Sequence, residues 1–176
     1  MLAVAGEHSG LLRHAILAHK QRAMPAMVGL LATLLARTLA VLLAAMPALN
    51  PARAVVVPVP PSSRRPLRLP VSELTDAVAR ASPDILALPV LRTVRRRGPQ
   101  KGLDAVARAA NVEGSMGVVG GARGRGSDLG PWPPWPVVVV DDVLTTGATM
   151  RAAISTLRAS RLRPVGAVAL AHARAP

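Results

Sequence analysis

The sequence contains no cysteine, phenylalanine or tyrosine, and its only aromatic residues are Trp132 and Trp135. Without cysteine, the chain can form no disulfide, no thiolate zinc site and no cysteine nucleophile. Without Phe or Tyr, the core must be built from Val, Leu and Ala. Because 51% of the 176 residues are hydrophobic, the chain is long and apolar enough to bury such a core, and we expect one globular unit.

Acidic residues are also scarce. Nine Asp and Glu stand against 22 Lys and Arg, which gives a formal net charge of +13. This excess favours anionic partners such as nucleic acid, phosphorylated metabolites or acidic lipid. The sequence lacks the interleaved aromatic residues on which single-stranded bases stack, so charge alone does not choose among these partners.

The segment 11–49 is rich in Ala and Leu. Pro25 and Pro47 bracket a long apolar helix that has no polar face, so we expect this helix to be buried on several sides. Its length would suffice for a bilayer, but Arg37 would lie near the bilayer centre at a cost of about 2.5 to 3.5 kcal/mol. We therefore expect a cytoplasmic protein without stable membrane insertion, in which residues 1–53 form a helical segment that packs on a domain over 54–176.

The domain over 54–176 alternates short apolar runs with amphipathic segments. We expect strands at 54–60, 84–92, 137–140 and 165–173, and helices at 71–81 and 148–160. The first of these helices opens at Ser72, a residue type that often caps helices. Strands that alternate with helices at this spacing predict an α/β fold with a mostly parallel sheet flanked by helices.

Two adjacent acids, Asp141 and Asp142, end the most apolar strand. Ligands of open parallel sheets bind beyond the carboxyl ends of the strands. The loop Thr145–Thr149 leads into a helix whose first N–H groups can bind a phosphate, and Gly147 lets the backbone come close. Carboxylates repel a phosphate, so the acids should face sugar hydroxyls or a magnesium ion, and the pattern predicts a phosphorylated ribose as the ligand. The alternative is a pair of solvated turn residues.

The segment 137–149 resembles the phosphoribosyl-pyrophosphate (PRPP) signature of type I phosphoribosyltransferases, in which Asp-Asp and Thr-Thr-Gly-Ala-Thr follow a strand. A second resemblance, to the ComF family, rests on Pro58-Val59-Pro60 before a basic loop and on a run after Gly98. The matching positions of that run are Gln100, Gly102, Leu103, Arg108 and Asn111.

The resemblance implies a type I phosphoribosyltransferase-like fold and a set of residue roles. Asp141 and Asp142 would be the catalytic acids, would hold the ribose hydroxyls and would bind Mg²⁺. The loop 62–68 and the segment 95–101 would take the places of the pyrophosphate loop and of the hood over the site. The residues that would contact the substrate are Val143, Thr145, Thr146, Gly147, Ala148, Thr149, Arg64, Arg65 and Lys101.

The chain departs from the ComF pattern in two ways. Arg65-Pro66-Leu67 stands where relatives carry Arg, Gly and an aromatic residue, and the cysteine-free sequence has no N-terminal zinc module. Two functions therefore stay open. The chain is either a phosphoribosyltransferase that transfers the sugar of PRPP to an unidentified base, or a non-catalytic PRPP- or nucleotide-binding protein that serves regulation or DNA uptake. ComF relatives are associated with natural competence, so DNA and a competence helicase are candidate partners.

Overall fold

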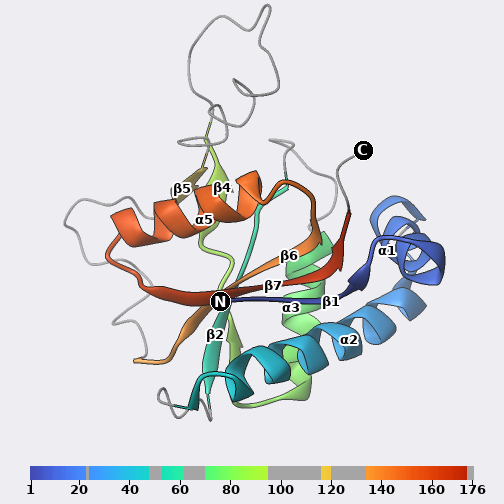
Figure 1. Cartoon of the computed structure of the whole chain (residues 1–176), viewed down its shortest axis with the longest axis horizontal. Coiled ribbons are helices and arrows are strands. Elements are labelled where there is room, and N and C mark those ends of the chain that lie inside the picture. Colours follow the sequence, from blue (N-terminus) through green and yellow to red (C-terminus); the bar gives the residue numbers. More distant parts are fainter. Residues whose placement is uncertain (23, 48–52, 62–69, 95–115, 120–133, 174–176) are drawn as a thin grey trace, which may run out of the picture.

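A computed structural model describes residues 1–22, 24–47, 53–61, 70–94, 116–119 and 134–173. It contains a five-stranded parallel sheet in the order β1-β7-β6-β2-β3 and a two-stranded antiparallel sheet, β4-β5 (Figure 1). The predicted α/β class and parallel sheet are therefore confirmed. The strands are β1 (Leu2–Glu7), β2 (Ala54–Pro58), β3 (Ile85–Ala87), β4 (Leu91–Thr93), β5 (Met116–Val118), β6 (Val137–Leu144) and β7 (Pro164–His172).

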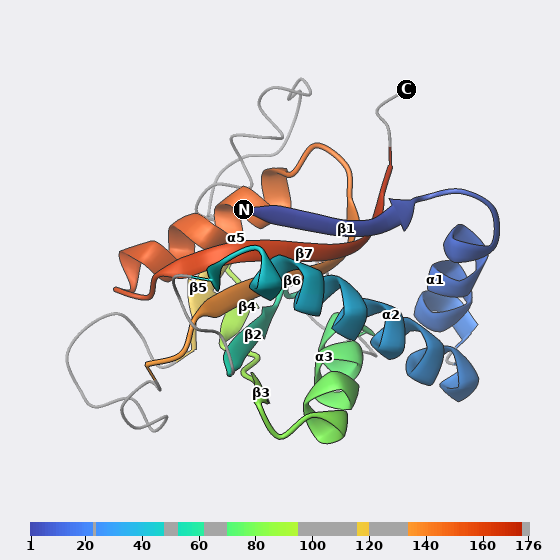
Figure 2. The same ribbon diagram turned by 60° about the horizontal axis from the view of Figure 1, so that its bottom comes forward.

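Four helices flank the large sheet in the described part of the chain. They are α1 (Gly10–Arg22), α2 (Pro25–Ala44), α3 (Pro70–Ala81) and α5 (Ala148–Ala159). Figures 1 and 2 show α2 and α3 on one face of the sheet and α5 on the other. The core is aliphatic on both faces: Leu31, Leu35 and Leu74 pack against one, and Met150 and Leu157 against the other.

Residues 2–7 form a strand, although we expected the segment 1–53 to be helical. β1 pairs in parallel with β7, with Leu2 opposite Ala167 and Glu7 opposite His172. The sequence Leu-Ala-Val-Ala-Gly-Glu has only one β-branched residue, so its strand conformation comes from this pairing rather than from local preference. The N-terminal segment thus begins inside the sheet of the domain.

The expected strand at 84–92 is two strands in two sheets. Residues 85–87 pair with β2, and residues 91–93 pair antiparallel with β5. Pro89 lies between them and has no N–H to donate to a ladder, which separates the two pairings. The helix expected at 71–81 starts at Pro70, which suits the first turn of a helix, so Ser72 lies inside the helix rather than at its cap.

Helix α2 is buried on one face only, not on several sides as we expected. Leu31, Leu35 and Leu42 pack into the core, whereas Leu30 and Val41 on the outer face are exposed. By length and composition alone, Ala26–Ala44 could cross a membrane, since its mean hydropathy is 2.1. In the fold, 39% of its most apolar stretch is buried. Since its inner face packs against β7, β1 and α3, it serves as a core helix in this fold.

Candidate functional site at the carboxyl end of the central strand

Asp141 and Asp142 lie within β6, the central strand, rather than in a loop after it. Beyond Val140 the strand stays paired with β7 as far as Leu144, opposite His172. Its pairing with β2 stops at Val140, where the N–H of Val59 donates to the carbonyl of Val140 at 2.8 Å. The two acids therefore begin where β6 loses its neighbour on the β2 side.

This point is also where the connections of the sheet diverge. From β2 the chain continues through α3 to β3, and from β6 it continues through α5 to β7 on the other side. Helices α3 and α5 lie on opposite faces (Figure 1). In open α/β sheets, such a reversal between adjacent strands opens a crevice at their carboxyl ends, and ligands bind there. The topology and the acids thus indicate the same location.

Asp142 forms an ion pair with Lys20 of α1. Lys20 Nζ lies 2.8 Å from Oδ1 and 2.7 Å from Oδ2 of Asp142, so one ammonium group contacts both carboxylate oxygens. The Asp142 side chain is 8% exposed, and that of Lys20 is 36% exposed. Asp142 is therefore a nearly buried anion whose charge is balanced by a partner from the N-terminal segment.

Sequence reasoning missed Lys20, which is 122 residues away from Asp142 along the chain. One signal was available: the chain uses Arg almost throughout, and Lys20 and Lys101 are its only lysines. An ammonium group is a compact charge on a flexible stem, whereas a guanidinium group is a wide planar fork. A lone Lys in a chain that otherwise uses Arg therefore marks a position where a compact cation fits.

Asp141 has a different environment. Burial and, to a lesser extent, the negative charge of Asp142 raise the pKa of Asp141 to about 7. The N–H of Asp142, which donates to Asp141 Oδ1 at 2.8 Å, and the charge of Lys20 oppose this rise in pKa. The two adjacent acids thus differ near neutral pH, since Asp142 is paired with a cation while Asp141 exchanges a proton.

The loop after β6 leads directly to the N-terminus of α5. Gly147 has φ of 73°, in the left-handed region that glycine adopts at low cost, and a Cβ there would lie 3.1 Å from Nη1 of Arg151. The N–H of Ala148 donates to Thr146 Oγ1 at 3.4 Å, and Arg151 Nη1 donates to the Thr146 carbonyl at 2.9 Å. The loop is therefore held by its own contacts and by an arginine of the helix.

This loop has the features of an anion site. The first turn of α5 contains no acidic residue, and its leading N–H groups have no partner within the helix. Thr145 and Thr146 are exposed, and Val143, Ala148 and Thr149 are partly buried around them. The structure thus brings together the acids, Val143 and the loop Thr145–Thr149. The expected contacts from Arg64, Arg65 and Lys101, and the segments 62–68 and 95–101, lie outside the described residues.

The acids suit Mg²⁺ in the chemistry of their donors, because this ion prefers carboxylate oxygens completed by water and substrate oxygens. Among the described residues, no group of three or more His, Asp or Glu could hold a metal ion by itself. A magnesium ion here would therefore need oxygens from a ligand, and it would compete with Lys20 for Asp142.

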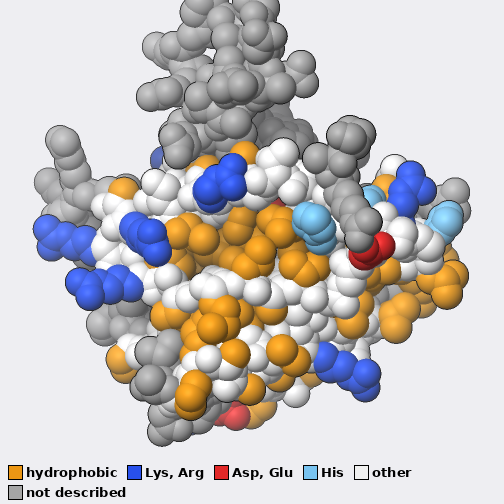
Figure 3. Space-filling view, viewed as in Figure 1, with side chains coloured by type: hydrophobic (Ala, Val, Ile, Leu, Met, Phe, Trp, Pro, Cys, Tyr) orange, Lys and Arg blue, Asp and Glu red, His pale blue; other side chains and the backbone are white. Residues whose placement is uncertain are grey.

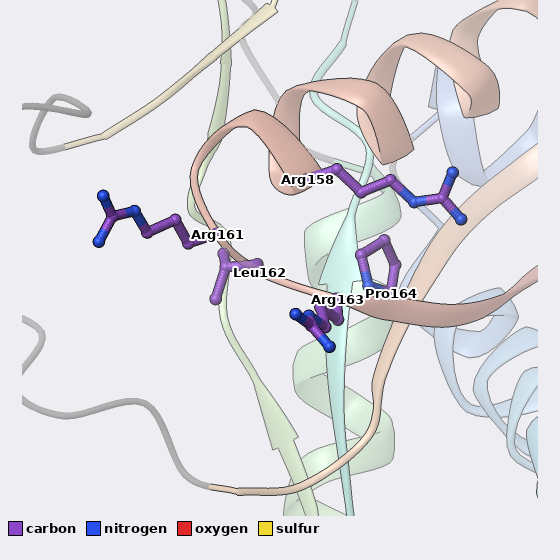
Figure 4. Close-up of a pocket in the computed structure, with 5 residues that line it drawn as sticks. All are labelled: Arg158, Arg161, Leu162, Arg163 and Pro164. Carbon is purple, nitrogen blue, oxygen red and sulfur yellow. The ribbon is translucent and has the colours of Figure 1, made fainter.

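A second polar surface lies at the other end of the sheet. Arg158 at the end of α5 and Arg161 and Arg163 before β7 line an open depression of about 570 Å³, together with Leu162 and Pro164. Figure 4 shows that the three arginines extend in different directions rather than toward one point. They can therefore contact separate anionic groups, but they do not enclose a single small anion.

Comparison with known proteins gave no assignment: no protein-family model matches the sequence, and no curated protein matches it. The geometry of the site and the resemblance of its motifs are therefore what indicate a function.

Proposed function

We propose that the chain binds PRPP or a related ribose phosphate together with Mg²⁺, as a ComF-like protein with a type I phosphoribosyltransferase-like fold. The observation that carries the proposal is the adjacency of two acids and a Gly/Thr loop at the carboxyl end of the central parallel strand. The divergence of α3 and α5 at the same point supports it, because this topology is where α/β sheets bind ligands.

In this proposal the 5′-phosphate of the ligand lies against the loop Thr145–Thr149 and the N-terminus of α5. The backbone N–H groups and the threonine hydroxyls donate to the phosphate oxygens. The ribose hydroxyls then extend toward the acids at the end of β6. Asp141 is the first to accept from them, because Lys20 occupies both oxygens of Asp142.

Asp142 contributes in one of two ways. Either it stays paired with Lys20 and positions the ammonium group beside the ligand, or it exchanges Lys20 for the ligand and Mg²⁺. In PRPP chemistry, magnesium neutralises the pyrophosphate that leaves. The role of the chain's own residues would be to orient the ribose, to hold the phosphate and to fix the proton on Asp141.

Catalysis would displace pyrophosphate from C1 of the ribose by an acceptor base. This reaction depends on positioning and on charge stabilisation more than on a strong base. The alternative is a protein that binds the same ligand without turning it over. Arg64, Arg65 and Lys101 would contact the pyrophosphate in the enzyme, and the Pro66-Leu67 step after Arg65 favours the binder.

Calorimetry and thermal unfolding with PRPP and Mg²⁺ test this proposal. We expect a rise in Tm that requires both components, since a ligand that binds only the folded state stabilises it. Asp141→Asn should weaken binding about tenfold or more, whereas Asp84→Asn, at the far end of the sheet, should not change it. No Tm shift, or an equal effect of both variants, would overturn the proposal. Pyrophosphate release across a panel of bases then separates the enzyme from the binder.

A second candidate function is contact with DNA in the cytoplasm, as an accessory of uptake or as a partner of a competence helicase. The observation that favours it is the set of diverging arginines Arg158, Arg161 and Arg163, which suits successive phosphates of a polyanion. This arginine surface lies at the opposite end of the sheet from Asp141 and Asp142. Binding of a ribose phosphate and contact with DNA therefore do not exclude each other.

Binding of a DNA oligonucleotide, measured by fluorescence anisotropy at several salt concentrations, tests this second function. Affinity should fall steeply with salt, and Arg158→Gln/Arg161→Gln/Arg163→Gln should make the slope shallower. The matched control changes three exposed arginines elsewhere, as Arg13→Gln/Arg37→Gln/Arg92→Gln. If both triple variants behave alike, the affinity reflects net charge, and the arginine surface is not the site.

A further inference from the structure

The acid pair near the end of β6 already holds a cation that belongs to the protein. Lys20 Nζ lies 2.8 Å from one carboxylate oxygen of Asp142 and 2.7 Å from the other. The charge of Lys20 also reaches Asp141, where it opposes the rise in pKa that burial causes. In the part of the chain that the structure describes, Lys20 is the only basic side chain that forms an ion pair with either acid. Its ammonium group therefore occupies the oxygens that a metal ion on Asp142 would need.

The packing of α1 holds this ammonium group in place. Ile16 and His19, three residues apart on the helix, are each 1% exposed. His19 Nε2 lies 3.0 Å from the carbonyl oxygen of Pro70, the first residue of α3. Figures 1 and 2 show α1 beyond the carboxyl end of β1 and next to α2. The Lys20 side chain is 36% exposed and has a flexible stem, so its ammonium can leave Asp142 while the helix stays in place.

A nearly buried carboxylate keeps its partner until another cation replaces it. The Asp142 side chain is 8% exposed, so the loss of Lys20 alone would leave a charge without compensation, which is strongly unfavourable. Hydrated Mg²⁺ competes poorly for such a carboxylate, because it gives up water reluctantly and is usually bound by one or two carboxylates together with substrate phosphates. Free Mg²⁺ and Mg²⁺ in complex with a phosphorylated ligand therefore differ in their ability to displace Lys20.

We propose that Lys20 excludes divalent metal from Asp141 and Asp142 in the free protein and gives way only when the ligand arrives together with Mg²⁺. The second half of this inference rests on the proposed binding of a ribose phosphate. The ligand supplies the further oxygens that the ion needs, and the displaced ammonium group then lies beside an anion. Lys20 is thus a positioning residue that makes the binding of metal depend on the binding of ligand.

Binding of Mn²⁺ to the full chain, with no ligand present, tests the exclusion. Electron paramagnetic resonance measures the free ion. The wild type should bind Mn²⁺ weakly, and Lys20→Met should bind it about tenfold or more tightly, because the oxygens of Asp142 are then open to the metal. Other carboxylates should add little binding, since the chain has nine acidic residues and Figure 3 shows them at few places on the face that it views.

Two control variants separate the ion pair from net charge. Arg13→Met removes one positive charge from an exposed position of the same helix and should bind Mn²⁺ as the wild type does. Lys20→Arg keeps a cation beside Asp142 and should also bind Mn²⁺ weakly. Equal Mn²⁺ affinity of the wild type and Lys20→Met, or an equal gain in Arg13→Met, would overturn the proposal. Circular dichroism verifies that each variant is folded.

Nuclear magnetic resonance of the wild type tests the exchange without relying on the folding of Lys20→Met. Lys20 and Lys101 are the only lysines, so labelling with ¹³C-lysine gives one set of side-chain signals for each, and Lys20→Arg identifies the set of Lys20. Mg²⁺ alone should leave the Lys20 signals unchanged, whereas Mg²⁺ with PRPP should shift them. A shift with Mg²⁺ alone, or no shift with both although the Tm rises, would overturn the proposal.

These measurements distinguish a failure of this inference from a failure of the proposed function. If PRPP with Mg²⁺ raises neither the Tm nor the binding heat, the proposed function is wrong. Tighter Mn²⁺ binding by Lys20→Met would still show that Lys20 keeps metal off the acid pair, because this measurement contains no ligand.

Discussion

The two ends of the same parallel sheet carry opposite chemistry. At the carboxyl end of β6, two acids and Lys20 lie before the loop that leads into α5. At the amino ends, Arg53 precedes β2, Arg163 precedes β7, and Arg158 and Arg161 close α5. The register places Val55, Val137 and Pro164 side by side, so these arginines share one edge of the sheet.

Helix α5 runs from the carboxyl end of the sheet to its amino end, and charged side chains lie near both ends of the helix. Its N-terminus has a partial positive charge and lies near Asp141 and Asp142, and its C-terminus has a partial negative charge and carries Arg158. Asp141 and Asp142 thus complement the N-terminus of α5, and Arg158 complements its C-terminus. A net charge of +13 therefore describes neither end of the sheet, although Asp84 pairs with Arg53 at the amino end and Arg151 contacts the loop at the carboxyl end.

Asp141, at the carboxyl end of β6, should make the free energy of unfolding depend on pH. Because the pKa of Asp141 rises from about 3.8 in the unfolded chain to about 7 in the fold, the folded chain keeps a proton between these values that the unfolded chain has released. The free energy of unfolding should therefore fall as the pH rises from about 4 to 7, by on the order of 2 to 4 kcal/mol.

Asp141→Asn removes this titration, so the variant should be more stable than the wild type above pH 7 and should show a flatter profile. Urea unfolding of both proteins between pH 4 and 8 measures the difference. As a control, Asp84→Asn at the arginine end, where the carboxyl is about half exposed, should follow the wild type. Parallel profiles for wild type and Asp141→Asn would contradict the assigned environment of Asp141.

Removing the cation at the same end should have a smaller effect. Lys20→Met leaves the nearly buried Asp142 without its partner, which should cost about 1 to 3 kcal/mol, reduced by the partial exposure of Lys20. Arg13→Met, on the same helix but exposed, should cost much less. Denaturant midpoints at pH 7 measure both variants, and equal midpoints would mean that the ion pair contributes nothing to stability.

A substitution at Arg161, at the amino ends of the strands, should have the smallest effect on stability. Arg161 has φ of 64° in the turn after α5, where the N–H of Leu162 donates to the carbonyl of Leu157 at 3.0 Å. This position of a helix end favours glycine. Arg161→Gly should therefore raise stability by up to about 1 kcal/mol while it weakens retention on a phosphate-bearing resin.

The matched control for this change is Arg158→Gln. It removes a charge from the same surface but leaves the positive φ of residue 161 in place. It should weaken retention without the gain in Tm. A loss of stability in Arg161→Gly would show that the arginine side chain supports the turn.

The sequence predicted those parts of the fold that are set by local pattern. β6, α5 and β7 were expected within one to four residues of their ends, because a continuous Val run, a Gly/Thr start and a helical period lie next to one another. β1 and Lys20 were not found, since both depend on partners more than 100 residues away along the chain. The continuation of β6 through the acids was missed for a related reason: pairing with β7, not side-chain preference, extends the strand.

The position of β7 between β1 and β6 has a consequence for biogenesis. In the described sheet β1 has only β7 as a neighbour, so β1 stays unpaired until residues 164–172 have been synthesised. Contacts between such distant segments slow folding, and an unpaired apolar strand is prone to aggregate while it waits. The nascent chain should therefore depend on chaperones until β7 is released, and truncation before Pro164 should leave both β1 and β6 without their shared neighbour.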